Sequence, residues 1–269
     1  GLYFATYRPA IPCICVAHQY LLLHNQFNNI SRNWFDRQLL NFNTKVTALG
    51  SSQKLALSFD QLENDISNNI AVVPPLLRSE VKRLSPSSKP FVLAYITHHK
   101  LAEDIATWHE NHRDVQIHCF WNNPDFSDEW VVRENLTFHQ VNAEKFLLMM
   151  ESCSGLVCTA GFESVCEAMY LGKPIMMVPV PNHIEKMINA HDGQRAGAGL
   201  ASTEFDFSKF LNYLPHHKSV QKEFIDWQQQ ANRLFLHYLE TLTQKPTQIF
   251  TFKPTGSRLG SWWKQLAFR

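Results

Sequence analysis

The feature that most constrains the fold is a regular alternation of short apolar runs and amphipathic stretches after Pro90. Strand candidates that alternate with helices at this spacing are typical of a parallel sheet with helices on both faces. The predicted strands are Phe91–Ile96, Val115–Trp121, Leu136–Gln140, Leu156–Thr159 and Ile175–Pro179. The predicted helices are Leu101–Asn111, Ala143–Cys153, Glu163–Leu171 and Ile184–Ala196. The sequence therefore predicts an α/β fold with one complete Rossmann-like domain.

The first 70 residues hold fewer elements. A strand over Ile11–Ala17, a helix over Trp34–Phe42 and a strand over Lys54–Phe59 are too few to close a domain of their own. Four prolines and a serine cluster then indicate a connection between domains. Apolar residues at three- and four-residue steps predict one long packing helix over Lys218–Leu242. The predicted division is 1–72 (partial N-terminal domain), 73–90 (linker), 91–215 (Rossmann-like domain), 216–245 (C-terminal helix) and 246–269 (tail).

Charge and composition exclude several classes of function. Lys and Arg number 25 against 24 Asp and Glu, so no net field favours a polyanion, and nucleic acid is not expected as a partner. No apolar run reaches the roughly 20 residues of a membrane span, and no signal peptide opens the chain, so we expect a cytoplasmic protein. Buried free thiols, without a metal site, are expected for the six cysteines, which are Cys13, Cys15, Cys119, Cys153, Cys158 and Cys166.

Both ends of the chain carry a specific expectation. The chain begins at Gly1 and runs directly into apolar residues, as though cut from something longer, so its native start is open. Near the other end, Trp262 and Trp263 lie beside Lys264 and Arg258. We expect a docked or free tail there, with peripheral contact to a membrane surface as the alternative.

One turn carries the chemistry. The strand that ends at Thr159 runs through Gly161 into a helix, and ligands of open parallel sheets bind beyond the carboxyl ends of the strands. Free backbone N–H groups and the positive helix end favour phosphate there. Gly161 would allow a tight turn and a close approach of phosphate, and Ser164 would add a hydroxyl. Glu167 lies one turn further along the helix, where it could accept hydroxyl groups of a ribose. An ordinary helix start with a favourable acid explains the same residues equally well.

The longer run favours the functional interpretation. AGFESVCEAMYLGKPIMMVPVPNHIEKMINA, residues 160–190, resembles the donor-binding signature of the GT-B glycosyltransferases, especially family 28 with the bacterial peptidoglycan N-acetylglucosaminyltransferase. The resemblance implies a GT-B-like fold with a truncated N-terminal domain, and a UDP-type nucleotide sugar as the donor substrate. No metal or further cofactor is implied. It implies that the diphosphate lies on Gly161, Phe162, Glu163 and Ser164, and that Glu167 binds the ribose.

The resemblance also assigns weaker candidates. Glu185 and Lys186 stand where the family usually has a Gln, or an acid and a Gln, at the donor sugar, so the identity of the sugar does not carry over. The backbone near Val141 takes the place of main-chain groups that hold uracil. His98 and His99 replace a Gly-rich loop, and they would either bond a phosphate or be exposed loop residues.

A catalytic role also follows from this comparison. His18 follows the first strand, where the family has a cleft-facing histidine. It is a candidate catalytic residue that would polarise an acceptor hydroxyl or contact the donor, with a structural histidine as the alternative.

Three functions stay open. The first is a glycosyltransferase, or its donor-binding part, that transfers a sugar to a glycan, a lipid-linked or a small-molecule acceptor. The second is a non-hydrolysing UDP-sugar epimerase with the same donor site. The third is an inactive nucleotide-binding or interaction module, which predicts UDP binding without turnover and a homodimer that covers an exposed sheet edge.

Overall fold

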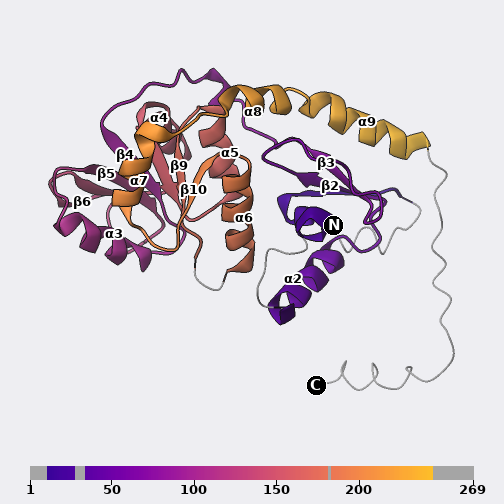
Figure 1. Cartoon of the computed structure of the whole chain (residues 1–269), viewed down its shortest axis with the longest axis horizontal. Coiled ribbons are helices and arrows are strands. Elements are labelled where there is room, and N and C mark those ends of the chain that lie inside the picture. The colour runs from indigo at the N-terminus through magenta and orange to yellow at the C-terminus, as the bar shows by residue number, and fades with distance from the viewer. Residues whose placement is uncertain (1–10, 28–33, 181–182, 245–269) are drawn as a thin grey trace.

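Two separate β-sheets organise the chain, and a connecting segment runs between them (Figure 1). The computed structural model of the protein describes residues 11–27, 34–180 and 183–244. The tail with Trp262 and Trp263 and the residues around Gly1 lie outside these ranges. None of the helices within the described ranges has the length and apolar character needed to cross a bilayer.

The larger sheet has seven strands in the order β10-β9-β8-β4-β5-β7-β6, and all neighbours are parallel except β6 and β7. Its strands are β4 (Phe91–Tyr95), β5 (Gln116–Trp121), β6 (Glu129–Arg133), β7 (Leu136–Gln140), β8 (Gly155–Cys158), β9 (Ile175–Met177) and β10 (Gly199–Ala201). Its helices are α3 (Leu101–Glu110), α4 (Ala143–Ser152), α5 (Phe162–Tyr170), α6 (Ile184–Arg195) and α7 (Phe207–Tyr213). The predicted doubly covered parallel sheet is confirmed.

Both faces of this sheet are buried because successive residues of each strand point to opposite sides. Along β4, Phe91 and Leu93 pack into a core with α4, α5 and α6, and Val92 and Ala94 pack into a second core with α3 and α7. The short strands β6 and β10 and the helix α7 were not predicted. β6 lies at an edge and alternates between exposed and half-buried residues, so it carries little apolar signal.

The smaller sheet contains β1 (Ile14–Ala17), β2 (Gln53–Leu57) and β3 (Ile70–Val73), all parallel in that order. The helix α2 (Trp34–Thr47) connects β1 to β2, with the short 3₁₀ helices η1 (His18–Leu23) and η2 (Asn25–Phe27) before it. The strand β3 was not predicted, because its buried run continues directly into the proline-rich segment.

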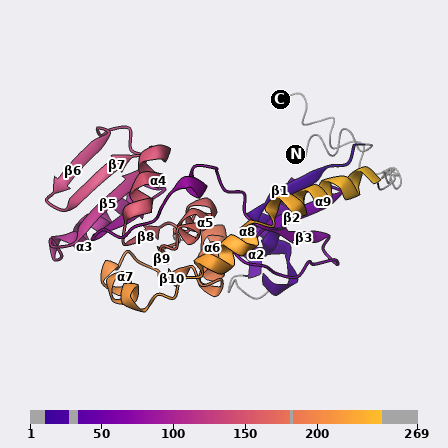
Figure 2. The same ribbon diagram turned by 90° about the horizontal axis from the view of Figure 1, so that it is seen from above.

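The C-terminal helices cross from the larger sheet to the smaller one, as Figures 1 and 2 show. One long helix was expected, but the structure has α8 (Gln221–Gln228) and α9 (Ala231–Gln244), separated by a two-residue turn. At this turn the N–H of Gln230 bonds the carbonyl of Trp227, three residues back, which tightens the helix end. Phe224 of α8 packs in the larger core, and Leu234 of α9 packs against the smaller sheet.

All six cysteines are free thiols, as predicted, and all are buried except Cys13, which is half-buried. Burial raises the pKa of the thiols of Cys119 and Cys166 well above the usual value, so both stay protonated at neutral pH. The structure therefore uses these cysteines as small apolar side chains.

Candidate functional site

The strand order places a switch point between β4 and β8. From β4 the chain winds outward through β5 and β7, then returns to β8 on the other side of β4. Ligands of open α/β sheets bind outside the carboxyl ends of the strands at such a point. The loops that follow the two strands meet here, since the hydroxyls of Thr97 and Thr159 lie 3.2 Å apart. The predicted turn after Thr159 therefore lies at the expected position for a ligand.

The turn itself differs from the expectation in one respect. The residue with left-handed backbone is Ala160, at φ 54°, whereas Gly161 has an ordinary φ of −74°. Gly161 therefore does not supply the tight turn. Its lack of a side chain leaves room instead, because a Cβ atom there would lie 3.3 Å from Ser164 Oγ and 3.7 Å from Lys186 Nζ. The carbonyl of Ala160 accepts a hydrogen bond of 3.1 Å from the Asn189 amide, which ties the turn to α6.

The start of α5 brings donors and a cation together. Gly161 is the N-cap residue, and no side chain caps the helix, so the first N–H groups of α5 remain available as at any helix start. Lys186, in the first turn of α6, places its ammonium group beside this turn. Glu163 is exposed in the first turn of α5, and Glu185 is half-buried beside Lys186. A cation and free N–H groups at one point suit an anionic ligand.

Glu167 is buried and already has a partner. Its Oε1 accepts a hydrogen bond of 2.6 Å from Nε of Arg78, and the two side chains are 6% and 38% exposed. Arg78 belongs to the segment between the two sheets, 89 residues away in sequence. Arg78 was not predicted and no motif signals it, because the ion pair forms only when the connecting segment packs against α5.

His18 is enclosed by aromatic rings at the contact between the two sheets. Its ring stacks on Phe162 with centroids 3.9 Å apart and lies 5.3 Å from the ring of Phe59. Nδ1 donates a hydrogen bond of 2.8 Å to the carbonyl of Leu57, so the neutral ring leaves Nε2 unprotonated. Burial lowers the pKa of His18 to about 4, and the hydrogen bond to Leu57 and the neighbouring Asn189 side chain oppose this shift only in part.

The remaining candidates lie along the same edge of the sheet. His98 and His99 are exposed after β4, with their rings stacked at 5.0 Å. Val141 is 54% exposed after β7, and its N–H bonds the carbonyl of Trp121, so its carbonyl is the main-chain group left for a base. The structure thus brings Gly161, Ser164 and Lys186 together, and places the two loop histidines and Val141 at neighbouring strand ends.

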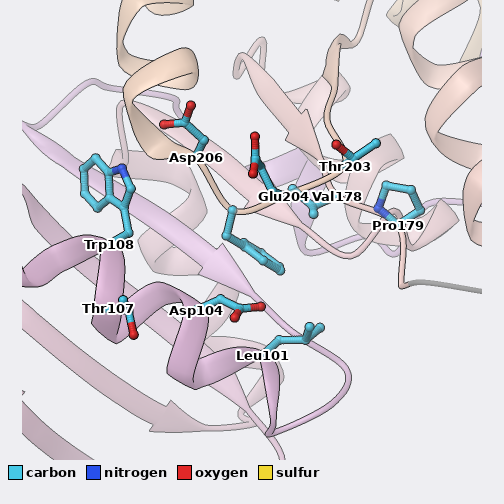
Figure 3. Close-up of a pocket in the computed structure, with 10 residues that line it drawn as sticks. Leu101, Asp104, Thr107, Trp108, Val178, Pro179, Thr203, Glu204 and Asp206 are labelled. Carbon is cyan, nitrogen blue, oxygen red and sulfur yellow. The ribbon is translucent and has the colours of Figure 1, made fainter.

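A separate cavity of about 490 Å³ lies on the face of the larger sheet that α3 and α7 cover, opposite the face that α5 covers. It lies between α3, the residues after β9 and the loop that leads into α7, and none of the predicted site residues lines it (Figure 3). Carboxylates of Asp104, Glu204 and Asp206 surround it together with Trp108, and its lining within the described residues holds no basic side chain. Because its carboxylates would repel a diphosphate, this acidic cavity suits that ligand poorly. The start of α5 suits a diphosphate better.

The comparisons with known proteins agree with this architecture. The chain belongs to glycosyl transferase family 1, because the model of that family matches residues 2–216. No curated protein matches the sequence. Among solved structures, the chain resembles UGT2 of Phytolacca americana, complexed with UDP-2fluoro-glucose and pterostilbene, at 12% identity and a TM-score of 0.57 over 91% of this chain and 74% of that one. It also resembles the glycosyltransferase of kitacinnamycin, at 12% identity and a TM-score of 0.56 over 90% of this chain and 72% of that one. A third similar structure is the spinosyn rhamnosyltransferase complexed with thymidine diphosphate, at 12% identity and a TM-score of 0.53 over 89% of this chain and 70% of that one.

These findings confirm the predicted GT-B-like α/β fold and the predicted class of glycosyltransferase. At 12% identity the structural likeness shows the fold alone, and the bound nucleotides and acceptor are ligands of those similar proteins. The matching model is that of glycosyl transferase family 1, and the finer likeness to family 28 is not tested by it.

Proposed function

We propose that the chain binds the diphosphate of a nucleotide sugar at the start of α5 and belongs to an enzyme that transfers the sugar to an acceptor hydroxyl. The observation that carries this proposal is the turn from Thr159 to Ser164. It lies at the switch point of the sheet, opens a helix with uncapped N–H groups, and has Lys186 beside it. Membership of glycosyl transferase family 1 and the ligands of similar solved structures support the same conclusion.

In the proposed reaction, the acceptor oxygen forms a bond to the anomeric carbon of the sugar while the bond from that carbon to the diphosphate breaks. The departing diphosphate gains negative charge, which the N–H groups of α5 and the ammonium group of Lys186 would stabilise. Glu185 would contact the sugar, and His98 and His99 would lie at the phosphates. Glu167 would hold the ribose, and the carbonyl of Val141 would face the base. This order of contacts is the part of the family 28 likeness that we retain as a proposal.

The acceptor proton needs a base, and His18 is the residue proposed for it. The neutral ring offers Nε2, since Nδ1 donates to Leu57. In the structure the ring is 9% exposed and its face is stacked on Phe162, so an acceptor reaches Nε2 only if the residues that enclose the ring move apart. The same closed contact favours a second function, a nucleotide-binding module without turnover.

Calorimetric titration tests the donor site. We expect wild-type protein to bind UDP, and Lys186→Gln to weaken UDP binding by about tenfold, because a charged hydrogen bond contributes roughly 1.5–3 kcal/mol. Uridine lacks the diphosphate, so its weaker binding should be unchanged. Lys209→Gln is the matched control, since Lys209 pairs with Glu204 on the opposite face. If wild type bound neither UDP nor TDP, the proposed donor site would be wrong.

Sugar transfer is tested separately from binding. A UDP-sugar incubated with a set of glycans and small hydroxylated acceptors should give free UDP and a glycosylated product. Binding without turnover would favour the module, and an altered free UDP-sugar without transfer would favour an epimerase. The division into domains, the homodimer, the cytoplasmic location, the lack of a required metal and the nature of the acceptor stay predictions.

A further inference from the structure

The segment between the two sheets is fastened to the larger one along much of its length. Val81 of η3 (Val81–Arg83) is fully buried in the core that contains α5, and Leu77 packs against the same core. The backbone N–H groups of Ser87 and Lys89 donate to the carbonyls of Glu151 and Ser152, at 2.9 and 2.7 Å. Arg78 therefore reaches α5 from a fixed piece of backbone rather than from a free linker.

The contact between Arg78 and Glu167 uses only part of each group. Nε of the guanidinium donates to Oε1 at 2.6 Å. Within the described parts of the chain, Oε2 accepts no hydrogen bond from another side chain or from backbone, and neither Nη atom donates one. The Arg78 side chain is 38% exposed, so these donors are accessible to a ligand. Within the described residues, the pair thus leaves one acceptor atom and two donor atoms without a protein partner, on the helix that follows the proposed diphosphate turn.

A ribose requires this combination. Its two neighbouring hydroxyls each donate one hydrogen bond and also accept, so a carboxylate oxygen next to N–H donors satisfies both. The terminal torsion of a Glu side chain is broad, so the carboxylate needs a fixed partner to hold one orientation. A carboxylate as buried as Glu167 also requires a counter-charge. Arg78 meets both needs at once.

We propose that Arg78 is a positioning residue of the donor site, which orients Glu167 toward the ribose hydroxyls and so makes the chain prefer ribonucleotides to 2′-deoxyribonucleotides. This inference rests on the proposed function, because it needs a nucleotide at the start of α5. A site built to hydrogen-bond a hydroxyl rejects an analogue that lacks it, since its buried polar groups are then left unpaired. The preference should therefore depend on the Arg78–Glu167 pair.

The test compares UDP with 2′-deoxyuridine diphosphate by calorimetry, in wild type, Arg78→Gln and Arg83→Gln. Wild type should bind UDP about tenfold more tightly than the deoxy analogue, as expected for a hydrogen bond to a charged group. Arg78→Gln should reduce this ratio to near one. Arg83 is exposed in the same segment, so Arg83→Gln should keep the wild-type ratio. Arg78→Lys retains the charge without the planar fork, and its ratio should fall between wild type and Arg78→Gln.

The ratio separates positioning from a purely structural role. If Arg78 only held the segment in place, Arg78→Gln would weaken both nucleotides equally, and an unchanged ratio would overturn the inference. A wild-type protein that bound both nucleotides equally well would overturn it too, while the proposed donor site would stand. A wild type that bound neither of these nucleotides nor TDP would overturn the proposed function together with this inference. Melting curves of each variant check that the fold is retained.

Discussion

The two sheets differ in how they complete their cores. The seven-stranded sheet is covered on both faces by helices that alternate with its own strands in the sequence. The three-stranded sheet has one such helix, α2, and takes the rest of its cover from distant parts of the chain. Ile188 of α6 and Trp227 of α8 fill one face, and Phe235 and Tyr238 of α9 pack on the other.

Because its cover comes from α6, α8 and α9, the smaller sheet depends on the larger unit for its stability. Polar contacts cross the same boundary, since Arg195 of α6 pairs with Asp60 after β2, and the indole of Trp227 donates to the carbonyl of Ser58 at 3.1 Å. The proposed diphosphate turn lies directly beside this boundary, because Phe162 contacts both Phe59 and His18. Loosening the smaller sheet should therefore be felt at the site.

The largest effect is expected from Phe59→Ala. Phe59 follows β2 but is 1% exposed within the core of the larger unit, where it also touches His18 and Phe162. Removing a buried Phe side chain should lower the free energy of unfolding by about 3–5 kcal/mol. Urea titration measures the loss. Hydrogen exchange should show that β1 to β3 lose protection before β4 and β5.

The matched control is Phe42→Ala, because Phe42 lies on α2 of the smaller unit but is 64% exposed. Its loss should change the free energy of unfolding by less than about 1 kcal/mol. If Phe59→Ala lowered protection uniformly across both sheets, the smaller sheet would not be the weaker partner, and the comparison would need revision.

The fold of the larger unit could be predicted because its strands are buried on both faces. Such strands read as continuous apolar runs, and those at β4, β5 and β8 were recognised with ends within one or two residues. The smaller unit could not be predicted in the same way. Its cover comes from α6, α8 and α9, and residues that meet across more than 100 positions leave no periodic signal.

The candidate site divides along the same line. The turn at Gly161, the serine at 164 and the lysine at 186 lie within one continuous motif, so the sequence could place them together. Arg78 could not be found, because an arginine in a polar connecting segment has no distinctive context. The stacking of Phe162 on His18 could not be predicted either, because the two residues are 144 positions apart in the sequence and no motif connects them.

Acid should affect the two sheets through different histidines. Burial lowers the pKa of His18, between the sheets, to about 4, and burial together with Lys145 lowers the pKa of His139, within the larger unit, to about 4. Both pKa values lie below the usual 6.5, so the unfolded chain binds more protons between pH 6.5 and 4. The contribution of each histidine to stability should therefore be fully present above pH 6.5 and should be lost through this window, by on the order of 2–3 kcal/mol for each group.

Single substitutions separate the two contributions. In His18→Gln the acid loss should be smaller than in wild type, and the remaining loss should appear in the exchange of β5 and β7 rather than β1 and β2. His183→Gln is the control, since His183 is exposed and should leave the wild-type profile unchanged. Urea titrations at pH 7 and pH 4.5 give the free energies. Equal acid losses in wild type and His18→Gln would show that His18 does not carry the pH dependence of the boundary.

The smallest effect that still separates the two sheets is expected from Trp227→Phe. This change keeps an aromatic ring in the core of the smaller sheet but removes the N–H that donates to Ser58 across the boundary. Leaving that buried carbonyl without its donor should cost about 1–3 kcal/mol, toward the lower end if water reaches it. Tyr238→Phe removes an exposed hydrogen bond of 3.1 Å from Asn64 at the outer end of the same helical pair, and should cost less than about 0.5 kcal/mol. Urea titration of both variants measures the two losses in free energy of unfolding. If these losses were equal, the buried hydrogen bond at the boundary would stabilise the smaller sheet no more than a surface contact does. The smaller sheet would then depend on the larger unit through apolar packing alone.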